Sequence, residues 1–93
     1  MYDICLRKVP TISINCAFSD HEGEKVILNV DTGKYFKLNS IGSKVFNLMT
    51  EDKNIETIIA TIAKDFDCNF ETIKEDILAF IKHCEDLSLV RLN

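Results

Sequence analysis

The spacing of apolar residues changes once along the chain, near Asn39, and this change limits the possible folds more than any other feature. Before Asn39, apolar and polar side chains alternate, which is typical of β-strands with one buried face. After Asn39, apolar residues recur every three or four positions, which is typical of helices with one buried stripe. Strands followed by helices predict an α+β domain with segregated layers.

The first predicted strand covers residues 11–18, where the alternation is regular. It places four apolar side chains on one face, namely Ile12, Ile14, Cys16 and Phe18. Residues 19–24 are polar and contain Gly23, so we expect a loop that closes a hairpin.

Two further strands follow this loop. Residues 25–30 are largely apolar and β-branched, and residues 31–33 form a turn with Gly33 where a positive φ is wanted. Residues 34–38 alternate again, with Phe36 and Leu38 toward the core and Lys34 and Lys37 toward solvent. The three strands together predict an antiparallel meander.

Three helices are predicted from their caps and stripes. Asn39 or Ser40 can cap the first helix, Asn54 the second and Asn69 the third. The predicted stripes are Ile41, Val45, Phe46, Leu48 and Met49; Ile55, Ile58, Ile59, Ile62, Ala63 and Phe66; and Phe70, Ile73, Ile77, Phe80, Ile81 and Cys84. Leu89, Val90 and Leu92 suggest a short extended tail. The expected order is therefore β-β-β-α-α-α.

Length and charge narrow the class of protein. The chain has 93 residues, which suits one domain. Residues 1–48 hold six Lys or Arg against five Asp or Glu, a net charge of +1, whereas residues 49–93 hold five against ten, a net charge of −5. An acidic helical half is a poor surface for nucleic acid. With no apolar run near ~20 residues and no secretion signal, we expect a cytoplasmic protein that does not bind membranes.

Residues able to carry chemistry are few. The cysteines, Cys5, Cys16, Cys68 and Cys84, form no CxxC pair, so we expect free thiols and no metal site. His21 and His83 are interpreted as structural residues, and the acidic positions of the third helix as a solvated face. Three glycines leave no room for a phosphate-binding loop. The sequence thus predicts no enzyme activity and no cofactor.

The third strand carries a pattern that resembles a known family. Gly33-Lys34-Tyr35-Phe36-Lys37-Leu38-Asn39 leads into Ile41-Gly42 and Val45-Phe46-Asn47-Leu48. The segments 76–81 and 87–90 then follow in matching order. Residues 26–92 together resemble the PqqD family, also called the RiPP recognition element, where RiPP denotes a ribosomally made and modified peptide. Phe46 stands where the family often has Trp, and Ser88 where it usually has Gly.

The resemblance implies one winged-helix-like domain over residues 1–93, with residues 1–10 as an irregular N-terminal arm. It implies that the leader region of a precursor peptide adds as a strand beside the third strand, in a groove against the third helix. Carried over, the backbone from Lys34 through Tyr35, Phe36 and Lys37 to Leu38 would pair with the leader. On the helix, Leu78 would line the groove, with Ile81 below it and Lys74 and Lys82 at its rim.

The implied function is a non-catalytic adaptor for a separate enzyme, such as a radical SAM maturase or a leader protease of a lasso-peptide pathway. The adaptor would be a monomer or a homodimer. One alternative is a winged-helix DNA-binding protein, but its recognition helix would bring Glu71, Glu75 and Asp76 toward phosphates. Another is a structural subunit that dimerises through its edge strand.

Overall fold

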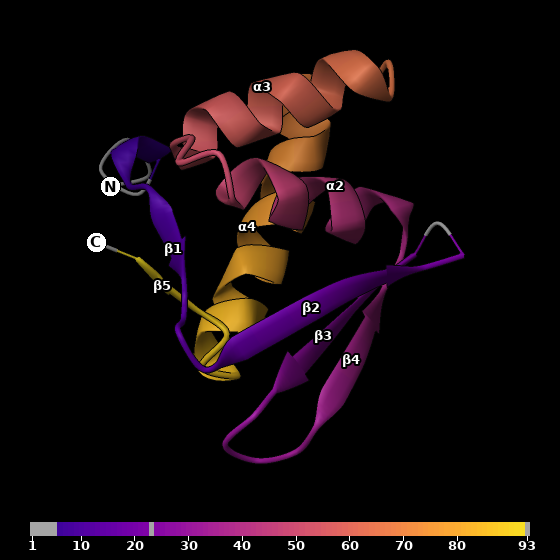
Figure 1. Cartoon of the computed structure of the whole chain (residues 1–93). Coiled ribbons are helices and arrows are strands. Elements are labelled where there is room, and N and C mark those ends of the chain that lie inside the picture. The colour runs from indigo at the N-terminus through magenta and orange to yellow at the C-terminus, as the bar shows by residue number, and fades with distance from the viewer. Residues whose placement is uncertain (1–5, 23, 93) are drawn as a thin grey trace.

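The structure, a computed structural model, describes residues 6–22 and 24–92. It contains, in chain order, β1 (Pro10–Ile12), β2 (Cys16–His21), β3 (Glu24–Asn29), β4 (Tyr35–Leu38), α2 (Ser40–Met49), α3 (Ile55–Asp65), α4 (Phe70–Asp86) and β5 (Val90–Leu92). In Figure 1, β2, β3 and β4 lie below α2 and α3, and β1 and β5 run side by side at the left. The predicted α+β fold, with a three-stranded antiparallel sheet and three long helices, is confirmed.

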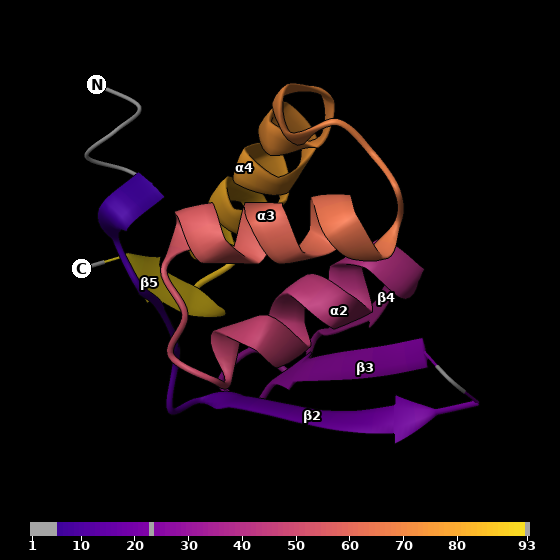
Figure 2. The same ribbon diagram turned by 90° about the horizontal axis from the view of Figure 1, so that it is seen from above.

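The main sheet has the order β2-β3-β4, with both pairs antiparallel. Ile27 of β3 lies opposite Phe18 of β2 and Phe36 of β4. In Figure 2 the helices all lie on one side of this sheet, and α2 lies between the sheet and α3. The opposite face of the sheet has no helix among the described residues.

Each long helix begins at a predicted asparagine. The side-chain oxygen of Asn39 accepts a hydrogen bond from the backbone N–H of Gly42, at 2.8 Å. Asn54 and Asn69 accept equivalent bonds from Thr57 and Glu71, also at 2.8 Å. Each bond satisfies a backbone donor that the first helical turn leaves unpaired. The structure therefore confirms the predicted caps and selects Asn39 rather than Ser40 for the first helix.

The core lies between the sheet and the helices, where the predicted stripes meet. Ile27, Phe46 and Ile62 are fully buried, and Ile77 and Ile81 of α4 are almost so. One prediction of this set is wrong. Phe66 follows the last residue of α3 and is 37% exposed, because the helix ends before its ring can turn inward.

The first predicted strand is wrong as a single element. β1 ends at Ile12, and the backbone N–H of Cys16 bonds to the carbonyl of Ser13 in a turn that leaves Ile14 fully exposed. The cause is a long-range pairing, since Ile12 lies opposite Val90 of β5. β1 and β5 form a separate two-stranded sheet, which alternation alone does not reveal.

The loops also differ from expectation. β2 continues to His21 and β3 begins at Glu24, so most of the predicted loop over residues 19–24 is strand. Glu22 adopts a φ of +54° at the turn, and Gly23 lies outside the described residues. The turn before β4 is confirmed, with a φ of +75° at Gly33.

The chain's start is tied to the fold from Leu6 onward. Leu6 is buried in the core and Pro10 begins β1, so this part of the predicted irregular arm packs on the domain. Residues 1–5, with Cys5, lie outside the described residues. Within the described ranges, no helix combines the length and apolarity needed to cross a membrane.

Candidate functional site

β4 forms one edge of the main sheet. It pairs with β3, and no other described strand lies on its far side. The backbone N–H of Asn29 donates to the carbonyl of Lys34 at 2.9 Å. In an antiparallel ladder alternate residues point their main-chain groups to the same side, so Phe36 and Leu38 also pair with β3. The N–H and C=O groups of Tyr35 and Lys37 therefore point to the free edge.

Two hollows lie along α4, the first beside this edge and the second between α4 and the start of α2, and together we name them the β4–α4 groove. The first hollow has a volume of about 250 Å³ and lies between β4 and α4. Its lining residues are Phe36, Lys37, Leu38, Asn39, Phe80, His83, Cys84, Leu87 and Leu89. The second hollow, of about 260 Å³, shares Asn39 and Phe80 with the first and extends along α4. It is completed by Ile41, Gly42, Val45, Ile73, Asp76 and Ile77. The groove thus sets apolar surface beside unpaired backbone.

Phe80 separates the two hollows, and Gly42 sets its position. A Cβ atom added at Gly42 would lie 3.4 Å from Cε1 of Phe80 and 3.2 Å from Oδ1 of Asn39. The distance to Asn39 is tighter than most contacts of a Cβ atom, and the distance to Phe80 is at the short limit of ordinary contact, so glycine leaves room for both side chains at the first turn of α2. The family-like Ile41-Gly42 pair therefore has a packing role.

The thiol in the groove is not a nucleophile. Burial, together with a smaller effect of the nearby Cys16 thiol, raises the pKa of Cys84 to about 11. Burial also raises the pKa of Cys16. A thiol acts as nucleophile or metal ligand only as the thiolate, which is scarce here at neutral pH. In residues 6–22 and 24–92, no cluster of His, Cys, Asp and Glu could hold a metal ion.

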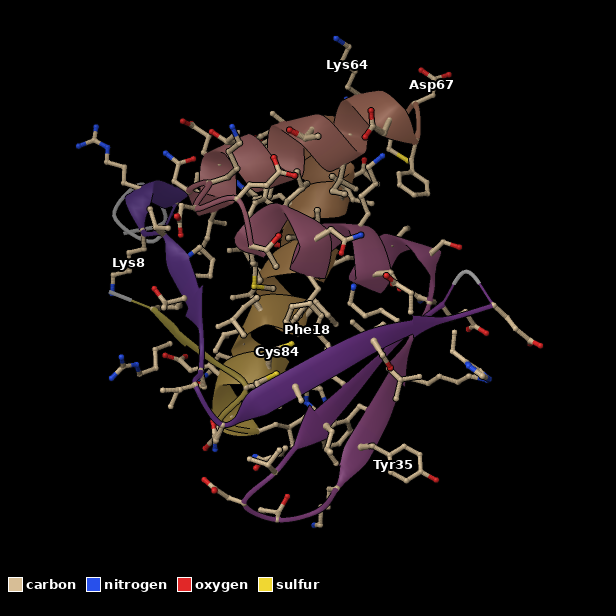
Figure 3. The ribbon with its side chains drawn as sticks, in the orientation of Figure 1. Lys8, Phe18, Tyr35, Lys64, Asp67 and Cys84 are labelled. Atoms are coloured by element: carbon tan, nitrogen blue, oxygen red, sulfur yellow. The ribbon has the colours of Figure 1, made fainter. Side chains whose placement is uncertain are left out.

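The structure brings together part of the predicted site. Phe36, Lys37 and Leu38 line the groove. Tyr35 is 73% exposed, and Figure 3 shows its ring pointing away from the helices. Lys34 directly precedes β4 and contributes its carbonyl to the pairing with β3. Three of the five predicted strand residues therefore line the groove, whereas Lys34 and Tyr35 do not.

The four predicted helix residues do not line the groove. Ile81 is 1% exposed within the core, and Leu78 lies about 200° around α4 from Phe80, given 3.6 residues per turn. Lys74 pairs with Glu71 at 3.0 Å, and Lys82 pairs with Asp86 at 3.5 Å. The sequence leaves the rotation of α4 against β4 open, and the structure turns these four residues away from the two hollows.

The groove is lined on α4 by Phe80 and His83 beside β4 and by Asp76 beside α2, and sequence reasoning missed all three as site residues. They recur at spacings of four and three residues, which marks one side of a helix. Phe80 was assigned to the core stripe, yet it is only partly buried at the border of that stripe. The sequence did offer one sign of this site, since Phe80 is an aromatic residue at the border between the apolar stripe and the polar side of the helix.

A larger hollow of about 750 Å³ lies at the corner between β1 and β2. It includes the exposed Ile14 and, from the C-terminal part of the chain, Glu85 and Arg91. Part of the main chain that lines this hollow is already hydrogen-bonded, because β1 pairs with β5 and the N–H of Ser13 donates to the carbonyl of Leu89 at 2.9 Å. We therefore assign the candidate site to the β4–α4 groove.

Comparison with known proteins identifies the family of this chain. The family model for coenzyme PQQ synthesis protein D (PqqD) matches residues 24–90, more than two thirds of the chain. The chain belongs to the PqqD family. None of the curated proteins matches it.

Two solved structures are similar to this PqqD-family chain. One is TbiB1 in complex with the TbiA(beta) leader peptide, with 27% identity and a TM-score of 0.83 over 87% of this chain and 94% of that one. The other is lasso peptide synthetase B1 complexed with the leader peptide, with 11% identity and a TM-score of 0.82 over 89% and 98%. At 11% identity the second structure supports the fold alone.

Proposed function

We propose that this protein is a non-catalytic adaptor that binds the leader region of a ribosomally made precursor peptide. The leader adds as a strand to β4, and the adaptor presents it to a separate enzyme, such as a leader protease or a radical SAM maturase. The observation that carries the proposal is the unpaired main chain of Tyr35 and Lys37 beside the apolar β4–α4 groove. Membership of the PqqD family and the likeness to leader-bound TbiB1 support it.

The groove is needed because strand addition alone binds weakly. Tyr35 and Lys37 offer four main-chain groups, and each hydrogen bond contributes about 1 kcal/mol net. Association and ordering cost several kcal/mol, which consumes most of that gain. Burying one apolar side chain adds about 1.5–3 kcal/mol. Two leader side chains in the two hollows therefore raise the affinity to a useful range.

The DNA-binding alternative is not favoured by the charges on α4. Glu71, Glu75 and Asp76 lie on this helix, and its lysines already have acidic partners, Glu71 for Lys74 and Asp86 for Lys82. Affinity for DNA depends on cations that neutralise phosphates. An acidic helix whose lysines are already paired cannot supply the cations that would neutralise phosphates.

A proline at the free edge tests the proposal directly. Lys37→Pro removes an N–H that points away from the sheet, so the β3–β4 ladder keeps its hydrogen bonds. We expect at least about tenfold weaker binding of a labelled leader, since a strand bond is lost and the ring blocks approach. Fluorescence anisotropy would measure this with leaders of precursor-like peptides encoded near the gene and with the TbiA(beta) leader.

Lys37→Ala is the matched control, because it removes the same side chain and retains the N–H. It should weaken binding by less than about threefold, as expected for an exposed charge. Circular dichroism should show that both variants remain folded. Binding by Lys37→Pro as tight as the wild type, or no binding of any leader, would reject strand addition at β4.

A further inference from the structure

The free edge of β2 lies on the side of the main sheet opposite β4. Each residue of this strand, Cys16–His21, pairs with one residue of β3, so the strand has no bulge. In Figure 2 β2 forms the outer margin of the sheet, and no other described strand pairs with it. It contains neither lysine nor proline, which often protect an edge from a second chain. This edge is therefore open to another strand.

Two residues of β2 offer all their outward main-chain groups. The N–H of Val30 donates to the carbonyl of Asn15 at 2.9 Å, so every second residue from Asn15 onward pairs with β3. The residues between them direct their main chain to the free edge. At Cys16 the N–H is already used, because it donates within the turn that precedes β2. Phe18 and Asp20 therefore supply the free donors and acceptors of this edge.

A second copy of β2 matches this pattern when it lies antiparallel to the first. With Phe18 of each copy opposite Asp20 of the other, every free N–H meets a free carbonyl. A two-fold axis then passes between the two Ser19 residues. Such a contact uses the same surface on both copies, so it closes at a dimer and does not continue into a fibre.

The charges on the helix-facing side of β2 suit the same register. Asp20 lies opposite Lys25, and Phe18 is the next residue of β2 on this side. The Lys25 ammonium lies 3.1 Å from the Asp20 carboxylate and 4.8 Å from the centre of the Phe18 ring. Asp20 of the second copy would lie beside Phe18, within reach of this ammonium as a diagonal neighbour. Each ammonium would then have a carboxylate on either side, and the two carboxylates would not oppose each other directly.

We propose that two copies of this chain associate through β2 and join their main sheets into one sheet of six strands. The proposal goes beyond leader binding and does not depend on it. The contact involves little more than one strand from each copy, so the dimer is weak and forms in proportion to concentration. Both β4 edges lie at the outer margins of the joined sheet, so each copy keeps its groove open.

Disulfide trapping tests the contact and its register. Ser19→Cys would place two thiols at the two-fold axis, where the Cα atoms lie about 4.5 Å apart, within the span of a disulfide. Ala17→Cys is the matched control, because it is exposed on the same face of β2 but would lie about 14 Å from its copy. Both changes are made in a protein with Cys5→Ser and Cys68→Ser, which removes Cys5 and the exposed Cys68.

In a glutathione redox buffer, we expect Ser19→Cys to form covalent dimers at least about tenfold faster than Ala17→Cys, because only the first pair of thiols is within disulfide distance. Non-reducing gel electrophoresis would measure both rates. Equal rates would overturn the proposal.

Sedimentation velocity measures the association of the unmodified protein. The wild type should sediment faster as its concentration rises from about 10 μM to about 1 mM, the range that suits a small interface. Asp20→Pro removes an outward N–H and leaves the β2–β3 ladder intact, so we expect at least about tenfold weaker association. Asp20→Ala keeps that N–H and should weaken association less than about threefold. A wild type that stays monomeric, or an Asp20→Pro variant that associates equally well, would overturn the proposal.

The opposite edge supplies a further control. Lys37→Pro alters the free edge of β4 in the same way and should self-associate as the wild type does. Loss of self-association in Lys37→Pro but not in Asp20→Pro would assign the contact to β4 and overturn the proposal. Leader binding is measured separately, so either conclusion leaves the test of the proposed function unchanged.

Discussion

The two edges of the main sheet are built alike but have different surroundings. β2 and β4 each pair with β3 only, among the described strands. The N–H of Val30 donates to the carbonyl of Asn15, so every second residue from Asn15 onward directs its main-chain groups toward β3. The main-chain groups of Phe18 and Asp20 therefore point to the free edge of β2, in the same way as those of Tyr35 and Lys37 on β4. Each edge therefore offers backbone donors and acceptors.

At the β2 edge the protein's own side chains pack against each other on the helix-facing side of the strand. The ring of Phe18 packs edge-to-face on Phe46, with centroids 5.2 Å apart. The Lys25 ammonium lies 4.8 Å from the centre of the Phe18 ring and 3.1 Å from the Asp20 carboxylate. At the β4 edge, α4 leaves the groove instead. The difference teaches that two edges with the same free backbone can offer a guest strand different amounts of unfilled apolar volume.

Truncating a core side chain of β3, the strand between the two edges, should have the largest effect on stability. Ile27 lies in β3 between Phe18 and Phe36 and is fully buried. We expect Ile27→Ala to lower the free energy of unfolding by about 2–5 kcal/mol, measured by urea denaturation. Leu28→Ala, on the helix-free face, should cost clearly less. Equal costs would show that the core does not separate the two faces of β3.

Two phenylalanines, one beside each edge, test the comparison itself. Phe80→Ala should weaken leader binding by at least about tenfold, because the ring forms a wall of both hollows. Phe18→Ala should reduce stability through the lost contact with Phe46 while changing leader affinity less than about twofold. Isothermal titration calorimetry on both variants would decide, and equal losses would place the leader elsewhere.

Alkaline pH should weaken the contact between the groove and the start of β2. The pKa of Cys84 is raised from 9.0 to about 11, so the folded state favours the protonated thiol. This stabilisation is complete below pH 9 and is lost as the pH rises toward about 11. The free energy of unfolding should fall over this range, and by less in Cys84→Ala. An identical fall in both proteins would mean that Cys84 is not the group responsible.

The smallest effect is expected at the corner before β2. Ile14 is fully exposed in the turn between β1 and β2. Ile14→Ser should change the melting temperature by less than about 3 °C, as surface substitutions usually do. A large decrease in the melting temperature, measured by differential scanning calorimetry, would show that Ile14 is buried, as the predicted continuous strand over residues 11–18 requires.

Much of the fold could be predicted because its causes are local. The asparagine caps and the stripes of α2, α3 and α4 depend on residues within one or two turns of each other. The broken strand at Ile14 and the pairing of β1 with β5 depend on residues about eighty positions apart. No local period contains that information.

Ser88 illustrates how a departure from the family can be resolved. It follows α4 with a φ of +61°, a left-handed conformation that glycine usually supplies. The N–H of Leu89 still bonds to the carbonyl of Cys84 at 2.9 Å, so the helix ends as it would with glycine. The serine adopts this conformation at an energetic cost, since the left-handed region is unfavourable for residues with a Cβ.

The sequence by itself determined the α+β class, the three helix starts and the strand that carries the free edge, because periodicity and capping act over short stretches of chain. Only the tertiary structure decided which side of α4 faces β4, and therefore that Phe80, Asp76 and His83 line the groove instead of Leu78 and Ile81. The rotation of a helix against a sheet is set by how side chains interlock across the whole core. That packing belongs to the assembled molecule.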